Sequence, residues 1–209
     1  PQPDATELEE MLQRLSQLGQ GDILVIAGSM QSSIPDTYYA QIVRMLQANG
    51  VLCIVDTSNA ALLHVLEEKP FLIKPNIQEL EELFRCPMRE GILFSSMQAL
   101  QQKGVRNVLV SCGDKGAYLL DEQGAIYYGK SVAGKVVSTI GCGDAMVGGF
   151  LYGWMEKNEY VHAFRMGLAA GSASAFTSGI ADGEAVRALL DRVEIEVLRT
   201  PVKMAPQDE

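Results

Sequence analysis

A glycine-rich turn beside a carboxylate is the stretch of this sequence best suited to chemistry. Gly141-Cys142-Gly143-Asp144 follows a β-prone apolar run, residues 132–137, and an expected helix covers residues 143–157. Glycines one residue apart allow a sharp turn whose backbone amides can face a ligand. A helix N-terminus adds unpaired N–H groups and a positive dipole end, so the turn can hold phosphate oxygens. This amide cradle with one carboxylate suits phosphoryl transfer to a hydroxyl group.

The same residues also have a purely structural interpretation. Gly-x-Gly turns are common, and an acidic residue in the first turn of a helix is stabilising by itself. A dinucleotide-binding fingerprint is not expected, because the third glycine of G-x-G-x-x-G would fall at Met146. A P-loop is not expected either.

The stretch resembles the C-terminal signature of the ribokinase/PfkB family of sugar kinases, roughly D-T-x-G-A-G-D. The resemblance implies that the amides of Gly141, Cys142, Gly143 and Asp144 hold the γ-phosphate of ATP and that Asp144 is the catalytic base. Cys142 stands where alanine is usual, and Ser138 where many members have Asp or Asn. The form V-S-T-x-G-x-G-D-x-M-V-G-G is similar to the 1-phosphofructokinase branch.

Length and composition restrict the class of protein. The 209 residues suggest one domain. A formal net charge of −9 argues against nucleic-acid and acidic-membrane partners. No signal peptide or membrane-length apolar run is visible. The four cysteines show no C-x-x-C spacing, so we expect free thiols and a cytoplasmic protein.

Short strands that are apolar throughout alternate with helical patterns, which predicts an α/β fold with a mostly parallel sheet covered on both faces. Strands are expected at 23–27, 51–55, 71–73, 107–111, 117–120 and 125–128, and helices at 1–18, 36–49, 59–66, 77–84, 93–103, 143–157, 161–177 and 183–192. The resemblance implies the three-layer αβα ribokinase-like arrangement as one nucleotide-binding and catalytic domain, residues 1–209.

Ligands of such sheets bind at the carboxyl ends of the strands. This rule is expected to gather the segments Gly28-Ser29, Asp56, Lys74-Pro75-Asn76, Ser111-Cys112-Gly113 and Gly141–Asp144 along one rim.

Lys74-Pro75-Asn76-Ile77-Gln78-Glu79 has two interpretations, which can hold together. Asn76 and Glu79 have the spacing of a helix capping box. The same spacing places an amide and a carboxylate one turn apart, where they could hold Mg²⁺ through its waters. K-P-N-x-x-E also resembles the family motif for Mg²⁺ and phosphate handling.

Ser111-Cys112-Gly113-Asp114-Lys115-Gly116 reads as a β-turn between strands. The resemblance implies that Ser111, Gly113, Lys115 and Gly116 line the nucleotide, although an exposed turn lysine is usually only solvated. The small-residue helix containing Ser174 is explained by close packing, and the resemblance adds Ser174 as a nucleotide contact.

Two further segments follow the family pattern in part. Gly28, Ser29 and Pro35 match a loop that faces the sugar in relatives, but Met30-Gln31-Ser32-Ser33 does not, which leaves the substrate open. Asp56-Thr57-Ser58 matches the D-x-S/T pattern of the family. For Ser58, the preferred interpretation is that it caps the following helix.

The chain is expected to be the C-terminal two thirds of such a kinase, without the N-terminal strands and lid. The function implied is ATP-dependent phosphorylation of fructose 1-phosphate to the bisphosphate, with tagatose-6-phosphate kinase as the nearest alternative. A non-catalytic nucleotide- or sugar-phosphate-binding module is the competing hypothesis. The chain alone is expected to be inactive. One side of its sheet would be unpaired and apolar, and a homodimer is one expected outcome.

Overall fold

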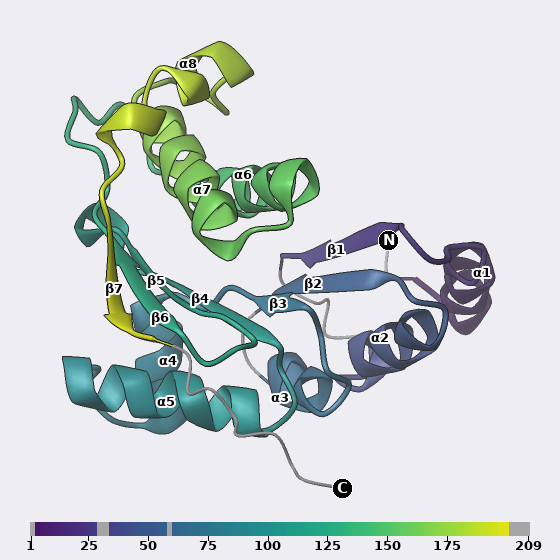
Figure 1. The fold of residues 1–209 in the computed structure, drawn as a ribbon. Helices are drawn as coiled ribbons and strands as arrows, with labels where there is room; N and C mark the ends of the chain where they lie inside the picture. Colours follow the sequence, from purple (N-terminus) through teal and green to yellow (C-terminus); the bar gives the residue numbers. More distant parts are fainter. Residues whose placement is uncertain (1–2, 29–33, 58–59, 201–209) are drawn as a thin grey trace, which may run out of the picture. The chain divides into compact units, whose positions relative to one another are not determined.

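The computed structural model describes residues 3–28, 34–57 and 60–200 (Figure 1). The chain divides into two compact units, Pro1–Leu109 and Val110–Glu209, each described here by itself. Ser29, Ser58 and the altered loop, residues 30–33, lie outside the described residues. No helix in the described part is long and apolar enough to cross a membrane. All four cysteines are free thiols, as expected.

The first unit is built on parallel strands in chain order. β1 (Ile23–Ala27), β2 (Leu52–Asp56), β3 (Leu72–Ile73) and β4 (Asn107–Ser111), which begins in this unit, pair in succession. Ile54, Leu72 and Ile73 are fully buried. Uninterrupted apolar strands are typical of parallel sheets, so the expected architecture is confirmed here.

Five helices belong to this unit: α1 (Ala5–Leu15), α2 (Tyr38–Ala48), α3 (Ala60–Leu66), α4 (Ile77–Phe84) and α5 (Glu90–Gln102). α2 buries Ile42, Val43 and Leu46, which recur at helical spacing and form one apolar stripe. α1 is amphipathic as expected but has no buried residue, and Met11 is half exposed.

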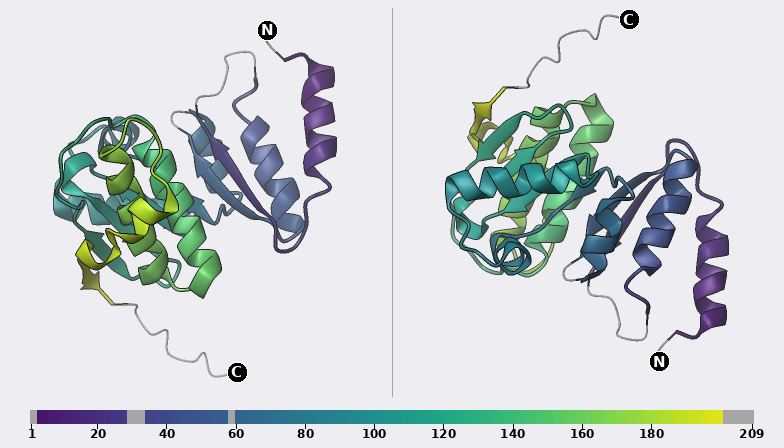
Figure 2. Two further views of the ribbon diagram at one scale, coloured as in Figure 1. Left: turned by 90° about the horizontal axis from the view of Figure 1, so that it is seen from above. Right: turned by 90° about the horizontal axis from the view of Figure 1, so that it is seen from below.

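The second unit joins an antiparallel ladder to a helical layer. β5 (Ala117–Leu120), β6 (Ile126–Gly129) and β7 (Ile195–Arg199) pair in that order. The helical elements are η1 (Gly113–Lys115), α6 (Cys142–Lys157), α7 (Tyr160–Ala175), α8 (Gly183–Arg187) and η2 (Leu190–Arg192). α6 and α7 lie side by side (Figures 1 and 2).

Close packing of α6 on α7 depends on glycine. A Cβ atom added at Gly149 would lie 2.6 Å from the Cβ of Ala170 and 2.6 Å from the carbonyl oxygen of Met166. A Cβ at Gly148, the next residue, would have no atom within 4 Å. The helices therefore touch along one face of α6 only, and the position of the α6 N-terminus is set by that contact.

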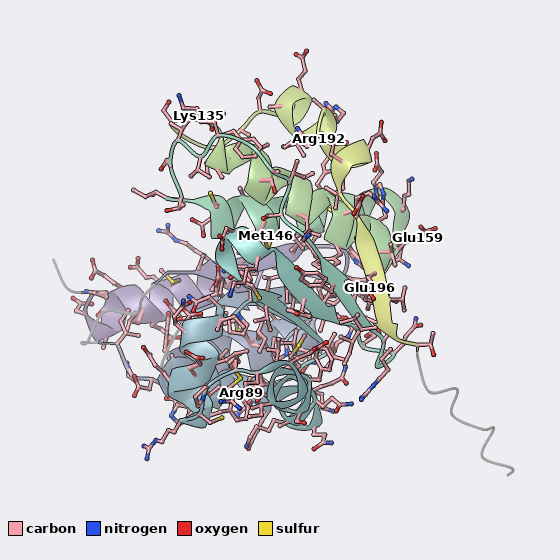
Figure 3. The ribbon with its side chains drawn as sticks, turned by 90° about the vertical axis from the view of Figure 1, so that its left-hand side faces the viewer. Arg89, Lys135, Met146, Glu159, Arg192 and Glu196 are labelled. Atoms are coloured by element: carbon pink, nitrogen blue, oxygen red, sulfur yellow. The ribbon has the colours of Figure 1, made fainter. Side chains whose placement is uncertain are left out.

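One expectation about this unit is wrong, one strand was not predicted, and one β-prone run forms no strand. Residues 132–137 form no strand: Val137 N–H donates to the carbonyl of Ala175 (2.7 Å), and Arg192 donates to the carbonyl of Ala133 (2.6 Å; Arg192 is labelled in Figure 3). The apolar run is thus bound to helical segments instead of a ladder. The helix expected over 183–192 breaks into α8 and η2, and β7, a half-exposed strand that includes Glu196 and Arg199, was not predicted.

We predict that Gly149→Ala lowers the free energy of unfolding by about 1–3 kcal/mol, because the added methyl group has no room between the helices. The matched control is Gly148→Ala, where space is open and removal of a helix-interior glycine favours the fold. Urea unfolding of both variants measures the difference. Equal effects of the two substitutions would contradict the packing argument.

Candidate functional site

The Gly141 turn has the geometry of an anion site. Gly141 is the N-cap of α6 with φ 79°, a left-handed conformation that glycine adopts without strain. The first helical bond runs from Ala145 N–H to Gly141 carbonyl (2.8 Å), and Cys142 N–H points to the carbonyl of Thr139 (3.4 Å). In the described part of the chain, the N–H groups of Gly143 and Asp144 face no acceptor. Free amides at a helix N-terminus attract an anion.

The Asp144 carboxylate is exposed beside these amides and forms no ion pair or hydrogen bond within the described residues. It lines a cavity of about 360 Å³ between α6, α7 and α8. Other residues of this wall are Gly148, Tyr152, Met166, Ala170, Ser174, Ile180, Val186 and Arg187. The carboxylate is therefore free to accept a proton or hydrogen bond from a bound molecule.

Cys142 contributes backbone rather than thiol chemistry. Its Sγ lies 3.6 Å from the carbonyl oxygen of Ser138. Burial raises the pKa of the Cys142 thiol, so the group stays neutral at physiological pH. A neutral side chain turned back on the loop is compatible with its place in an anion-binding turn.

The loop after β4 forms a second glycine-containing turn. Residues 113–115 form η1, and a Cβ at Gly116 would lie 2.0 Å from the carbonyl oxygen of Gly129, so only glycine fits there. Lys115 is exposed, and its carbonyl accepts from Tyr128 Oη–H (2.7 Å). None of Ser111, Gly113, Lys115 and Gly116 lines the cavity of Asp144. Their proposed contact with nucleotide stays a prediction.

Ser174, in contrast, lines the same cavity as Asp144. It is buried on α7, and its Oγ accepts from Ala181 N–H (3.1 Å). This bond holds the segment after α7 against the helix, which is a sufficient structural role. The contact of Ser174 with nucleotide stays a prediction.

In the first unit, the ends of β2 and β3 bring opposite charges together. Lys74 Nζ lies 3.2 Å from Asp56 Oδ1, and the Lys74 side chain is 8% exposed. Next to Asp56, the Thr57 hydroxyl is buried and lacks a hydrogen-bond partner among the described residues. Gly28 N–H donates to the Asp56 carbonyl (3.1 Å). The rim expected at these strand ends is thus formed within this unit by Gly28, Asp56 and Lys74.

The capping box predicted at α4 is confirmed. Asn76 N–H donates to Glu79 Oε2 (2.8 Å), and Glu79 N–H donates to Asn76 Oδ1 (2.9 Å). The described residues contain no group of three His, Cys, Asp or Glu side chains able to enclose a metal. Mg²⁺ keeps several waters and needs few carboxylates. The second carboxylate oxygen of Glu79 fits such a water-mediated role, which stays a prediction.

One motif was missed. Residues 124–131, Gly-Ala-Ile-Tyr-Tyr-Gly-Lys-Ser, have the G-x-x-x-x-G-K-S spacing of a P-loop, which the sequence analysis did not expect. Ile126–Gly129 form β6, paired to β5 and β7. The segment therefore lacks the loop between strand and helix that cradles phosphate. The match is coincidental.

Comparison with known proteins agrees with this geometry. The model of the pfkB family carbohydrate kinases matches residues 2–185. The 1-phosphofructokinase of Bacillus subtilis is 35% identical over 192 residues, 90% of this chain and 62% of the relative. The 1-phosphofructokinase of Borreliella burgdorferi is 31% identical, and the match covers 96% of this chain and 65% of that relative. The D-tagatose-1-phosphate kinase of Klebsiella oxytoca is 30% identical, and the match covers 90% of this chain and 62% of that relative.

Solved structures show the same fold. A crystal structure assigned to a Staphylococcus aureus phosphofructokinase superposes with a TM-score of 0.88 at 33% identity, covering 95% of this chain and 65% of that one. Phosphofructokinase-2 of Escherichia coli, in complex with potassium, has a TM-score of 0.84 at 27% identity, with coverages of 90% and 62%.

This chain thus spans less than two thirds of the length of these relatives. The family model nevertheless covers most of the chain, including the Gly141 turn and the Asn76 cap. The fold is the α/β, ribokinase-like fold that the resemblance implied. The chain belongs to the pfkB family of carbohydrate kinases.

Proposed function

We propose that this chain carries the catalytic part of an ATP-dependent kinase that phosphorylates a hydroxyl group of a ketohexose phosphate. The observation that carries the proposal is the Gly141 turn. Two free backbone N–H groups and an unpaired carboxylate stand together at the start of α6, on the wall of a cavity. Phosphoryl transfer to a hydroxyl requires this combination of anion stabilisation and proton acceptance.

In the proposed reaction, Asp144 orients the acceptor hydroxyl and takes its proton. The hydroxyl oxygen bonds to the γ-phosphorus as the bond to the bridging oxygen breaks, and ADP leaves. The amides of Gly143 and Asp144 stabilise the charge of the transferring group. The position of the carboxylate matters most in this step, because the transition state of phosphoryl transfer is loose.

The first unit supplies groups suited to phosphate and cation. Lys74 is a buried ammonium held by Asp56, and Asn76 and Glu79 would hold Mg²⁺ through its waters. When Mg²⁺ is bound, it would neutralise negative charge on the phosphate groups. An acidic chain of net charge −9 attracts no anion by its overall field, so local groups of this kind must do so.

The relatives support fructose 1-phosphate as the substrate, with fructose 1,6-bisphosphate as the product. Curated relatives include 1-phosphofructokinases and a D-tagatose-1-phosphate kinase. Both names indicate ketohexoses phosphorylated at carbon 1, whose free hydroxyl at carbon 6 is the expected acceptor. This chemistry favours a 1-phosphate over the tagatose 6-phosphate considered from the sequence.

A non-catalytic nucleotide- or sugar-phosphate-binding module is the second candidate function. It is favoured by the length comparison, since more than a third of each curated relative cited has no counterpart in this chain. The two candidates differ in one observable. The binding module would hold ATP with no transfer of the γ-phosphate to any sugar phosphate.

Replacing Asp144 by Asn is predicted to lower the rate of phosphoryl transfer by roughly 100-fold or more, the scale of a lost base. The affinity for ATP should change little, because the backbone amides remain. A coupled assay of the full-length protein with fructose 1-phosphate measures the rate. Glu159→Gln is the control, since Glu159 is an exposed carboxylate of the same unit that forms no cap bond (Figure 3). Near-normal turnover of Asp144→Asn would remove this residue from its role.

The variant Glu79→Gln distinguishes a role of Glu79 in Mg²⁺ binding from its role in the helix cap. The amide oxygen of Gln can still accept from Asn76 N–H, so the melting temperature should stay nearly unchanged. The Mg²⁺ concentration for half-maximal rate should rise several-fold if the carboxylate acts on the ion. Glu82→Gln, an exposed residue of the same helix, is the control. A Mg²⁺ titration that is unchanged in Glu79→Gln would assign Glu79 to the cap alone.

A further inference from the structure

The segment that connects α7 to α8, residues 176–182, is anchored to the end of α7 (Figure 1). Ala181 N–H donates to Oγ of Ser174 (3.1 Å), a side chain that is 1% exposed. The Thr177 hydroxyl lies 2.5 Å from the carbonyl oxygen of Gly179, which closes a turn at the start of the segment. A buried hydroxyl that accepts a backbone N–H fixes the position of that backbone relative to the helix. Ile180, the residue before Ala181, is therefore held in a defined place.

The side chain of Ile180 lies against the Gly141 turn. A Cβ atom at Gly141 would lie 2.8 Å from Cδ1 of Ile180, so Ile180 occupies the space that a side chain at residue 141 would need. Ile180 also lines the cavity of Asp144. Yet it is 63% exposed, so burial of apolar surface is a weak reason for an isoleucine at this position. Contact with the turn is a more specific reason.

The chain before the turn is held by the same end of α7. Val137 N–H and Ser138 N–H both point to the carbonyl oxygen of Ala175, at 2.7 Å and 3.3 Å. Gly141 itself has φ 79°, and a glycine can adopt many other conformations at little cost. The contacts around Gly141 must therefore select the conformation that leaves the amides after it free. Ile180 makes one of these contacts, directly at the residue that turns.

We propose that Ile180 is a positioning residue for the Gly141 turn and that Ser174 acts through it. The inference rests on the anion site proposed above. Ile180 restricts Gly141 to one conformation, and its apolar side chain keeps water from one side of the turn. Hydrogen bonds from backbone amides to a phosphate oxygen are stronger where water is excluded. Ser174 keeps Ile180 in place through the N–H of Ala181.

The first test measures the conformation of the turn without any ligand. Ile180→Ala removes the contact at little cost in stability, because most of the side chain is exposed. Val161→Ala is the matched control, since Val161 is 38% exposed on α7 and is not among the residues that line the cavity. We expect the NMR order parameters of the Gly141 and Gly143 amides to fall in Ile180→Ala and to stay unchanged in Val161→Ala.

The second test compares the binding of MgATP and MgADP by calorimetry. ADP lacks the γ-phosphate, so the ratio of the two affinities reports on the anion site at the turn. Ile180→Ala should reduce the preference for ATP by about fivefold or more, the scale of a weakened hydrogen bond to a charged group. The affinity for ADP should stay unchanged. Ile180→Leu, which keeps a side chain of the same size, should restore most of the preference.

A double-mutant cycle separates positioning by Ser174 from a direct contact with nucleotide. Ser174→Ala should lower the preference for ATP in the unmodified chain, and it should add little in the Ile180→Ala background because it acts through Ile180. Additive losses would overturn the positioning role of Ser174. Circular dichroism checks that each variant is folded, and the exposed residue Ile180 decides the question if Ser174→Ala is not.

Two results would overturn the inference as a whole. One is an order parameter at Gly141 that Ile180→Ala leaves unchanged. The other is a preference for ATP that is absent from the unmodified chain, or that Ile180→Ala and Val161→Ala alter equally. None of these measurements includes a sugar phosphate or requires transfer of the γ-phosphate. A protein that shows both effects but transfers no phosphate would contradict the proposed kinase activity and leave this inference standing.

Discussion

The packing of α6 against α7 is the contact on which the candidate site of the second unit depends. Gly149 allows the two helices to approach so closely that a single added methyl group would overlap with Ala170. Because helices are rigid over this length, that contact fixes where the α6 N-terminus lies and which way its free amides point. The geometry of the turn at Gly141, which we propose to bind an anion, is thus a consequence of helix packing as much as of its own glycines.

In this protein, short-range interactions of individual groups matter more for anion binding than the net charge of the chain does. The chain is acidic overall, and the groups that we propose to bind anions are backbone N–H groups at a helix N-terminus and one buried ammonium, Lys74. Asp56 compensates the charge of Lys74 at 3.2 Å. A buried lysine would otherwise carry a large desolvation cost. Such short-range groups discriminate by position, which suits a phosphoryl transfer enzyme.

The capping box shows how a structural role and a proposed functional role can share residues. Asn76 and Glu79 satisfy one another's backbone N–H groups, and one oxygen of Glu79 remains outside that exchange. The cap holds the carboxylate in one conformation. A cation bound through water at this position would therefore pay little for ordering its ligand.

Local chemistry determined much of this protein from sequence alone. The apolar strands β1 and β2, the capping box at α4 and the glycine turn before α6 were all predictable, because each depends on neighbours within a few residues. Tertiary structure decided the rest. The run 132–137 is β-prone but binds α7 and Arg192 instead, since no strand is available to it. The G-x-x-x-x-G-K-S match became part of β6 because β5 and β7 pair with it from either side. The alternation of apolar and polar residues in β7 is too weak to predict a strand, which forms because β6 has an edge with which it can pair.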